Sequence, residues 1–227
     1  MNWPELTPAM KELLVQAIAS LAGALVGALA AFQLEARRQR GKEQQGRIDR
    51  LNKAIFSLGM QRNYLVNLKR QQLDPYREHP LRAFLPAVLQ SPMTSSIEWT
   101  ELTFLLNDPS QGDLLNRFAL SDDGFRTVVG LVETRREMHS RFQERLDLWK
   151  KENPDVPDEL GLALITRAVG MPLSVQLTNV TDHLYESVER ALTANRSIYT
   201  RMTSAFVRLF PKKKHVKVEE LEKPMEV

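Results

Sequence analysis

The sequence predicts an all-α protein with a single N-terminal transmembrane helix that continues into a cytoplasmic bundle of three long helices, capped by short helices. Three observations lead to this fold class. An early stretch of the chain carries no charge at all. Three later stretches place apolar residues at intervals of three and four, the period of one helix face. No stretch alternates between apolar and polar residues, as a half-buried strand would.

The uncharged stretch is residues 13–34, LLVQAIASLAGALVGALAAFQL, a run of about 22 residues. At a rise of about 1.5 Å per residue, a helix of this length crosses the hydrocarbon of a bilayer. A cleaved signal peptide is an alternative, because Ala28-Leu29-Ala30 is a small-x-small site, but the leader carries Glu5 and Glu12 and has little basic character. A buried core helix is a further alternative, although uncharged runs this long are rarely core elements. We therefore expect a retained span preceded by a short external leader, residues 1–12.

Basic residues beside the predicted span indicate its orientation. Arginine and lysine are enriched on the cytoplasmic side of membrane helices. Only Lys11 precedes the span, whereas a basic cluster follows it directly. We therefore expect localisation in the plasma (inner) membrane, with the N-terminus outside and the C-terminal domain in the cytoplasm. The residues expected to meet anionic lipid at the membrane surface are Arg37, Arg38, Arg40, Lys42, Lys212, Lys213 and Lys214.

One face of the predicted span consists of small residues. Ala19, Gly23, Gly27 and Ala31 recur every four residues. Small side chains let two membrane helices approach closely, so packing between helices can replace contacts with lipid. Alanine and glycine are also common in membrane spans generally. The repeat favours a homo-oligomer, or association with a second membrane protein.

The predicted bundle domain covers residues 35–210. Its first helix is expected over residues 35–73, with weak points at Gly41 and Gly46, where glycine costs about 1 kcal/mol against alanine. Beyond these glycines the apolar residues keep a seven-residue spacing that forms a narrow seam. The seam contains Ile48, Leu51, Ile55, Leu58 and Leu65.

Five prolines divide residues 74–120 into short pieces. We expect short helices at about 80–90, 95–106 and 111–119, which together would cap the bundle. Ser121 and Asp122 are suitable N-cap residues for a second long helix. The remaining elements are predicted as that helix over residues 121–152, a short helix after Asp158, a third long helix over residues 172–210, and a disordered tail over residues 211–227.

Polar residues interrupt the apolar seams of all three long helices. Arg62, Arg135, His139 and Asn195 could form a buried polar layer that sets register or pairs with a partner. For the two arginines we favour the other interpretation, in which their side chains extend past the edge of the seam to water. His139 could be a pH-responsive buried base near Arg135, but we interpret it as a half-exposed residue at the edge of the apolar face.

The sequence contains no recognisable catalytic constellation. The phosphate-binding and nucleophile-elbow glycine motifs are absent, and the chain has no cysteine. Helical bundles hold two irons with Glu-x-x-His motifs, whereas His183 and Glu186 stand in the reverse order. The net charge of +3 and the scattered aromatic residues do not indicate a nucleic-acid surface. We expect no cofactor, no metal site and no nucleic-acid partner.

These observations favour a non-enzymatic, single-pass membrane-anchored protein that self-associates or binds a cytoplasmic protein. Its partners would be membrane lipid, further copies of itself or a second membrane protein. The main alternative is a membrane-acting effector or channel-like oligomer, for example in a bacterial defence system, for which Gln16, Ser20 and Gln33 are polar residues in the span. A membrane-tethered hydrolase with its site in the proline-rich cap is a minor alternative.

Overall fold

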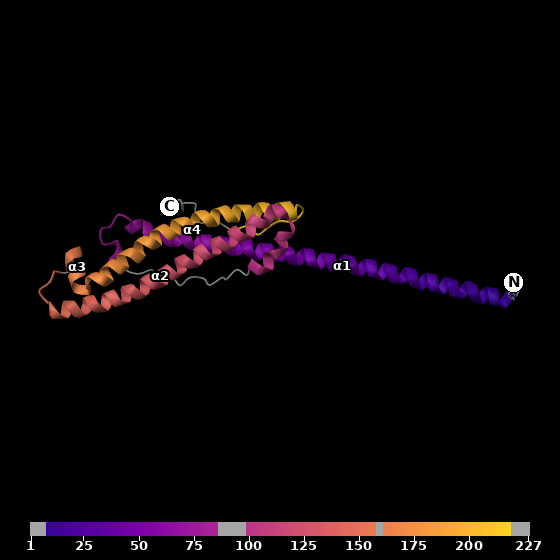
Figure 1. Cartoon of the computed structure of the whole chain (residues 1–227), viewed down its shortest axis with the longest axis horizontal. Helices are drawn as coiled ribbons and strands as arrows, with labels where there is room; N and C mark the ends of the chain where they lie inside the picture. The colour runs from indigo at the N-terminus through magenta and orange to yellow at the C-terminus, as the bar shows by residue number, and fades with distance from the viewer. Residues whose placement is uncertain (1–7, 86–98, 158–160, 219–227) are drawn as a thin grey trace, which may run out of the picture. The chain divides into compact units, whose positions relative to one another are not determined.

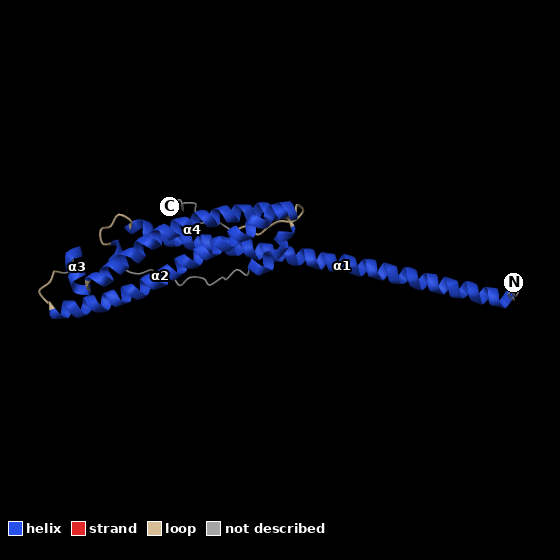
Figure 2. Ribbon diagram, in the orientation of Figure 1, coloured by secondary structure: helices blue, strands red, loops and turns tan. Residues whose placement is uncertain are grey.

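The computed structural model describes residues 8–85, 99–157 and 161–218, and all the regular elements in these ranges are helical (Figure 2). The all-α prediction is therefore confirmed for the described part of the chain. Residues 1–7, which hold most of the predicted leader, lie outside it. The chain divides into two compact units, Met1–Asp49 and Arg50–Val227, and each is described by itself.

The longest element is helix α1, Pro8–Leu68, which contains the predicted span and continues through Gly41 and Gly46 without a break in the helix. Its apolar residues at position 13 and from 17 to 34 are exposed, as Leu21 at 73% and Phe32 at 75% illustrate. One helix of the described chain, α1, is long and apolar enough to cross a membrane. A π-helical turn, η1 (Lys69–Leu73), follows α1 directly.

The seam on the second half of α1 is buried in the second unit. Leu51, Ile55, Leu58 and Leu65 are each fully buried. Helices α2 (Gly112–Glu152) and α4 (Met171–Leu209) lie side by side in Figure 1 and share a hydrophobic core with this part of α1. The core residues are Leu65, Leu68 and Leu73 from α1 and η1, Phe125, Val128 and Val132 from α2, and Leu184, Val188 and Ala191 from α4.

The predicted start of the second long helix at Ser121 is wrong, because α2 begins at Gly112 and includes the piece predicted as a separate short helix. Ser121 and Asp122 are buried inside the helix. The Asp122 carboxylate does not cap a helix end. It accepts hydrogen bonds from Gln61 Nε2 and Arg126 Nε, each at 2.8 Å, so it is satisfied in the helix interior.

In the described part of the proline-rich region the chain forms 3₁₀-helical turns. The turns are η2 (Asp74–Tyr76), η3 (Arg82–Phe84), η4 (Trp99–Asn107) and η5 (Pro109–Gln111). Two of them, η2 and η5, contain a proline, which has no backbone donor and is tolerated in the first turn of a helix. Residues 86–98, which include parts of two predicted helices, lie outside the described residues.

A second hydrophobic core forms where α2 meets the short helix α3, Leu162–Val169, and the start of α4. Gly170 joins α3 to α4 with a φ of 86°, a conformation that favours glycine. This core contains Ala83, Phe84, Phe142, Ile165, Val169, Leu173 and Leu177. Asp158, predicted as the cap of the short helix, lies outside the described residues.

The chain leaves α4 at Phe210 and is described as far as Val218. The prediction of a wholly disordered tail is wrong for this segment, because the Val216 N–H donates to Asn52 Oδ1 at 3.0 Å. Low apolar content suggested that the tail could not pack, but the Val216 backbone and the Val218 side chain both contact α1. Residues 219–227 lie outside the described residues.

Candidate functional site

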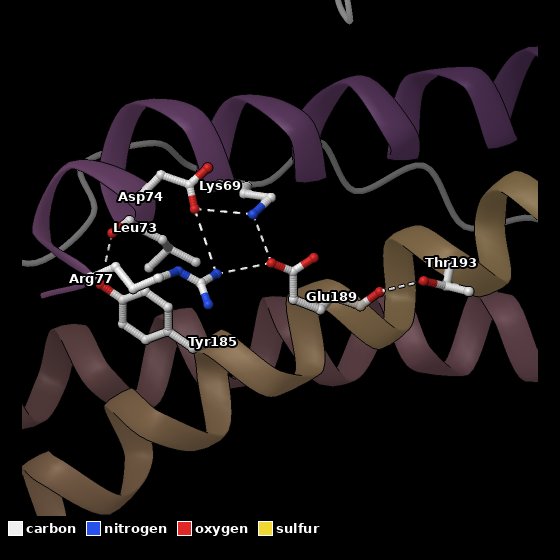
Figure 3. Close-up of polar contacts among 7 residues, drawn as sticks. All are labelled: Lys69, Leu73, Asp74, Arg77, Tyr185, Glu189 and Thr193. Carbon is white, nitrogen blue, oxygen red and sulfur yellow. Dashed lines mark hydrogen bonds and ion pairs between the residues drawn. The ribbon is translucent and has the colours of Figure 1, made fainter.

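A group of polar contacts between distant parts of the chain lies where η1 ends α1 beside α4, and we call it the η1 junction (Figure 3). The hydroxyl of Tyr185, from α4, donates to the backbone carbonyl of Leu73 at 2.8 Å. A π-helical turn leaves backbone groups displaced from the regular α pattern, and such turns are frequent at functional sites. The Tyr185 bond fixes the end of this turn against α4.

Two cations and two carboxylates alternate around the η1 junction (Figure 3). Lys69 Nζ lies 2.6 Å from Glu189 Oε1 and 3.0 Å from Asp74 Oδ1. Arg77 Nη2 lies 2.9 Å from the same Glu189 oxygen and 3.5 Å from Asp74. The hydrogen bond to Glu189 raises the pKa of the Lys69 ammonium. Because the four charges balance, this group is suited to holding η1 on α4 and not to capturing an ionic ligand.

Tyr185 is also flanked by two guanidinium groups. The Cζ atoms of Arg77 and Arg82 each lie 5.4 Å from the centre of its ring, within the range of cation–π attraction. Arg82 is paired in turn with Asp182, one turn earlier on α4, at 2.9 Å. Burial raises the pKa of the Tyr185 phenol. The phenol therefore stays protonated at neutral pH and keeps its hydrogen bond to Leu73.

A second, buried group holds the backbone of residues 82–85 against α2. Arg135 donates to the carbonyl of Leu85 at 3.0 Å and to Thr181 Oγ1 at 3.1 Å. His139 Nε2 lies 3.1 Å from the carbonyl of Phe84. We call Arg135 and His139 the buried clamp, because both bind main-chain oxygens of the same short segment.

Burial governs the protonation of the clamp. It lowers the pKa of Arg135 and that of His139, and the nearby charge of Arg135 lowers the pKa of His139 further. The interpretation of His139 as half exposed is wrong, since it is 8% exposed. Arg135 is 6% exposed and does not extend to water, because carbonyl groups and a threonine hydroxyl provide acceptors for it inside the fold.

The other two predicted seam residues are also buried, but Asn195 binds elsewhere. Asn195 Nδ2 donates to the carbonyl of Leu58 at 3.1 Å and so joins α4 to α1. Arg62 is 5% exposed. The clamp therefore binds the segment at residues 82–85, whereas Asn195 binds the middle of α1's second half.

The sequence reasoning missed the buried pair formed by Gln61 and Asp122, whose side chains bond at 2.8 Å between α1 and α2. Gln61 is 1% exposed and Asp122 is 6% exposed. The signal that could have found the pair is the spacing of Phe118, Asp122 and Phe125. Asp122 lies between two aromatic residues on one helix face, which is an unusual place for a helix cap.

The residues predicted to associate or to meet lipid remain exposed in this structure. Ala19, Gly23, Gly27 and Ala31 are exposed, and an added side chain at either glycine would meet no other described part of the chain within 4 Å. The basic residues of the two predicted lipid-facing groups are exposed as well: Arg37, Arg38, Arg40, Lys42, Lys212, Lys213 and Lys214.

Comparison of the chain with known protein families, curated proteins and solved structures finds no match. Within the described ranges, no group of three or more histidine, aspartate or glutamate side chains is placed to hold a metal ion. The contacts of the η1 junction and the buried clamp join separate elements of the fold. They fasten the segment that follows α1 onto α2 and α4.

Proposed function

We propose that this protein is a non-enzymatic, single-pass membrane-anchored helical protein that self-associates or binds a protein partner at the inner face of the membrane. The observation that carries the proposal is the exposure of the apolar residues in 17–34, such as Leu25 at 61% and Phe32 at 75%. A helix that is apolar on every side is stable when lipid or protein covers it. Residues 13–34 belong to the first unit, Met1–Asp49, and in this proposal lipid or another membrane helix covers them.

In this proposal, the second unit is a cytoplasmic bundle built from the second half of α1 with α2 and α4. The shared core of leucine, valine and phenylalanine residues supports this arrangement. The η1 junction and the buried clamp then secure the polypeptide at the end of α1. The long helices α2 and α4 would present their exposed faces to a partner.

Self-association would use the small-residue face of the span. Gly23 and Gly27 leave open space around the helix in which a second helix could pack. In lipid, close approach of two backbones supplies the attraction, and a side chain larger than alanine on that face keeps the helices apart.

A pair of reporter fusions tests the membrane topology. A C-terminal reporter that is active only in the cytoplasm is expected to work, and a periplasmic reporter at the same position is expected to be inactive. Neutral replacements of Arg37, Arg38, Arg40 and Lys42 are expected to weaken this preference, because the asymmetry of basic residues sets orientation. The reverse pattern of reporter activity would exclude a cytoplasmic role for the second unit.

Crosslinking of the full chain in membranes tests self-association. Gly23→Ile and Gly27→Ile are expected to abolish the crosslinked oligomer and leave membrane insertion intact, since isoleucine is more apolar than glycine. Leu25→Ile is the matched control and is expected to crosslink like the parent. If both glycine variants assemble normally, the span is not the assembly element. Dye leakage from vesicles on incorporation of the parent would support a membrane-acting effector.

A further inference from the structure

The C-terminal segment, residues 215–218, lies on the second half of α1, and we call it the strap. Its polar contact with α1 is the hydrogen bond from the Val216 N–H to Asn52 Oδ1 at 3.0 Å. The ring of His215 packs edge-on against Phe206 of α4, with the ring centroids 5.8 Å apart. The strap therefore joins the end of α4 to α1.

Gly59 provides the space in which the strap sits. A Cβ atom added at Gly59 would lie 2.5 Å from Val218 Cγ2 and 2.6 Å from Val218 Cβ, which is too close for any side chain. Added Cβ atoms at Gly41 and Gly46 on the same helix would meet nothing within 4 Å among the described residues. Glycine costs about 1 kcal/mol inside a helix, and contact with Val218 provides a physical reason for it at position 59.

The connection between α4 and the strap makes little contact with the rest of the protein. Lys212, Lys213 and Lys214 are exposed, and the described backbone bond there is the local one from Lys213 N–H to the Phe210 carbonyl at 2.9 Å. Segments with few buried contacts open more readily than packed helices do. The strap can thus leave α1 without disturbing the hydrophobic cores of the second unit.

We propose that Asn52 and Gly59 form a docking seat for the C-terminal segment, which is filled in cis by the chain's own strap and accepts the same segment from a second copy when the strap is displaced. Gly59 selects a β-branched side chain by leaving room for both of its methyl groups. Asn52 selects an extended backbone by accepting its N–H. The closed strap then competes with the segment of the second copy for the seat. This proposal concerns the second unit alone and does not depend on α1 crossing a membrane.

Disulfide trapping on the full chain in detergent tests the seat with a synthetic peptide. The chain has no cysteine, so introduced thiols react only with each other. The acceptor is the double variant Asn52→Cys/Val218→Gly, in which the loss of the Val218 side chain empties the seat. The disulfide at position 52 takes the place of the hydrogen bond that Asn52 accepts, so trapping reports on the Gly59 part of the seat. The probe is the peptide KKKHCKV, which corresponds to residues 212–218 with cysteine at position 216. We expect it to be trapped by this acceptor and far less by Asn52→Cys with Val218 intact.

Two controls show whether Gly59 and Val218 determine the trapping. Adding Gly59→Ala to the acceptor is expected to abolish trapping, because the new Cβ fills the space for the valine. The peptide KKKHCKG, which lacks that valine, is expected to be trapped as poorly. Asn179→Cys, at an exposed position of α4, replaces Asn52→Cys as the control for random collision. Equal trapping in the presence of Gly59→Ala, or equal trapping of both peptides, would overturn the proposal.

A size exchange tests the closed strap in cis. Gly59→Ala is expected to release the strap and so to accelerate hydrogen exchange at the Val216 amide. The double variant Gly59→Ala/Val218→Gly is expected to slow that exchange again, because glycine at 218 removes the three Val218 atoms that an alanine at 59 would meet. Gly130→Ala, at an open helical position of α2, controls for the general effect of the substitution. Unchanged exchange at Val216 in Gly59→Ala would show that the seat does not hold the strap.

Discussion

The two halves of α1 are both rich in apolar residues, yet they are built for different surroundings. In residues 17–34 the apolar side chains surround the helix and are exposed, as at Leu21 and Phe32. In residues 51–68 the large aliphatic side chains form one stripe, with Leu58 and Leu65 fully buried against other helices. A stripe directs a helix to a protein surface, whereas an apolar surface on all sides suits lipid. The distribution of apolar residues around the helix therefore separates the two halves better than their number does.

The largest expected effect comes from placing the same charge in each half. Leu58→Asp puts a carboxylate at a position that is 0% exposed, and we expect it to destabilise the second unit by about 3–5 kcal/mol, since an unpaired buried charge is among the most costly substitutions. Thermal unfolding of the full chain in detergent, followed by circular dichroism, measures this loss.

The partner variant is Leu25→Asp, at a position that is 61% exposed. We expect the thermal transition of the second unit to be unchanged and membrane insertion to weaken by about 2.5–3.5 kcal/mol, the cost of an aspartate near the centre of a span. Membrane fractionation measures the second effect. If Leu25→Asp lowered the thermal transition as Leu58→Asp does, residues 13–34 would belong to a protein core.

The second prediction concerns how buried polar groups are tolerated in the second unit. Arg135→Met is expected to lower the free energy of unfolding by about 1–3 kcal/mol, because the carbonyl of Leu85 loses its buried donor. Its neighbour Arg136 is exposed and pairs with Glu133 at 3.4 Å, so Arg136→Met is expected to cost less than about 1 kcal/mol. Urea unfolding of both variants measures the difference. Equal losses would mean that the clamp has no special role in holding residues 82–85.

The periodic elements were predictable from sequence because burial on one helix face leaves a direct pattern. The seam on α1 and the extent of α4 follow from apolar residues at helical spacing. The start of α2 was not predictable in this way. Ser121 and Asp122 have the chemistry of a helix cap, but the partners of the Asp122 carboxylate inside the helix are Gln61 and Arg126, and the bond to Gln61 is a contact between distant residues.

The candidate site was predictable in part. Arg135 and His139 stand out as polar residues within an apolar stripe, but their acceptors are main-chain oxygens of residues 82–85, which no side-chain pattern encodes. The strap was missed because its contact rests on the absence of a side chain at Gly59. The amino-acid composition of residues 211–227 is polar. One valine, Val218, changes that composition too little to predict a contact.

The third prediction is a pH dependence carried by His139. Burial lowers its pKa below the ordinary value of 6.5, so the unfolded chain binds a proton at a higher pH than the folded protein does. Stability therefore rises with pH through this range, and it is lost as the pH falls from 6.5 towards the folded pKa. Free energies of unfolding at about pH 5 and about pH 8 measure the slope.

His139→Gln is expected to flatten this dependence, because glutamine does not titrate. The groups that face His139 are the Phe84 carbonyl, the Gln143 amide and the Arg135 guanidinium, and the guanidinium stays charged over this range. His183→Gln, at an exposed position of α4, is the matched control. A parent and a His139→Gln variant with the same slope would show that another group carries the pH response.

The smallest expected effect comes from the charges of the η1 junction, which are close together but partly exposed. Glu189→Gln removes the carboxylate that Lys69 and Arg77 share at 2.6 Å and 2.9 Å. Both cations keep Asp74, and water screens the group, so the loss is expected to be at most about 1 kcal/mol. It is expected to shrink when the salt concentration is raised from about 0.1 M to about 1 M, where the screening length falls to about 3 Å.

Unfolding in urea at the two salt concentrations measures the effect, with Glu186→Gln as the control one turn away, where the partner Arg190 lies at 3.7 Å. The buried clamp is expected to behave differently in the same measurement. Arg135 is buried, so its contribution to the free energy of unfolding is expected to persist at high salt. The expected order would be wrong if Glu189→Gln lost more free energy of unfolding than Arg135→Met did, and if that loss did not change with salt concentration. The η1 junction, and not the clamp, would then be what holds the polypeptide after α1 in place.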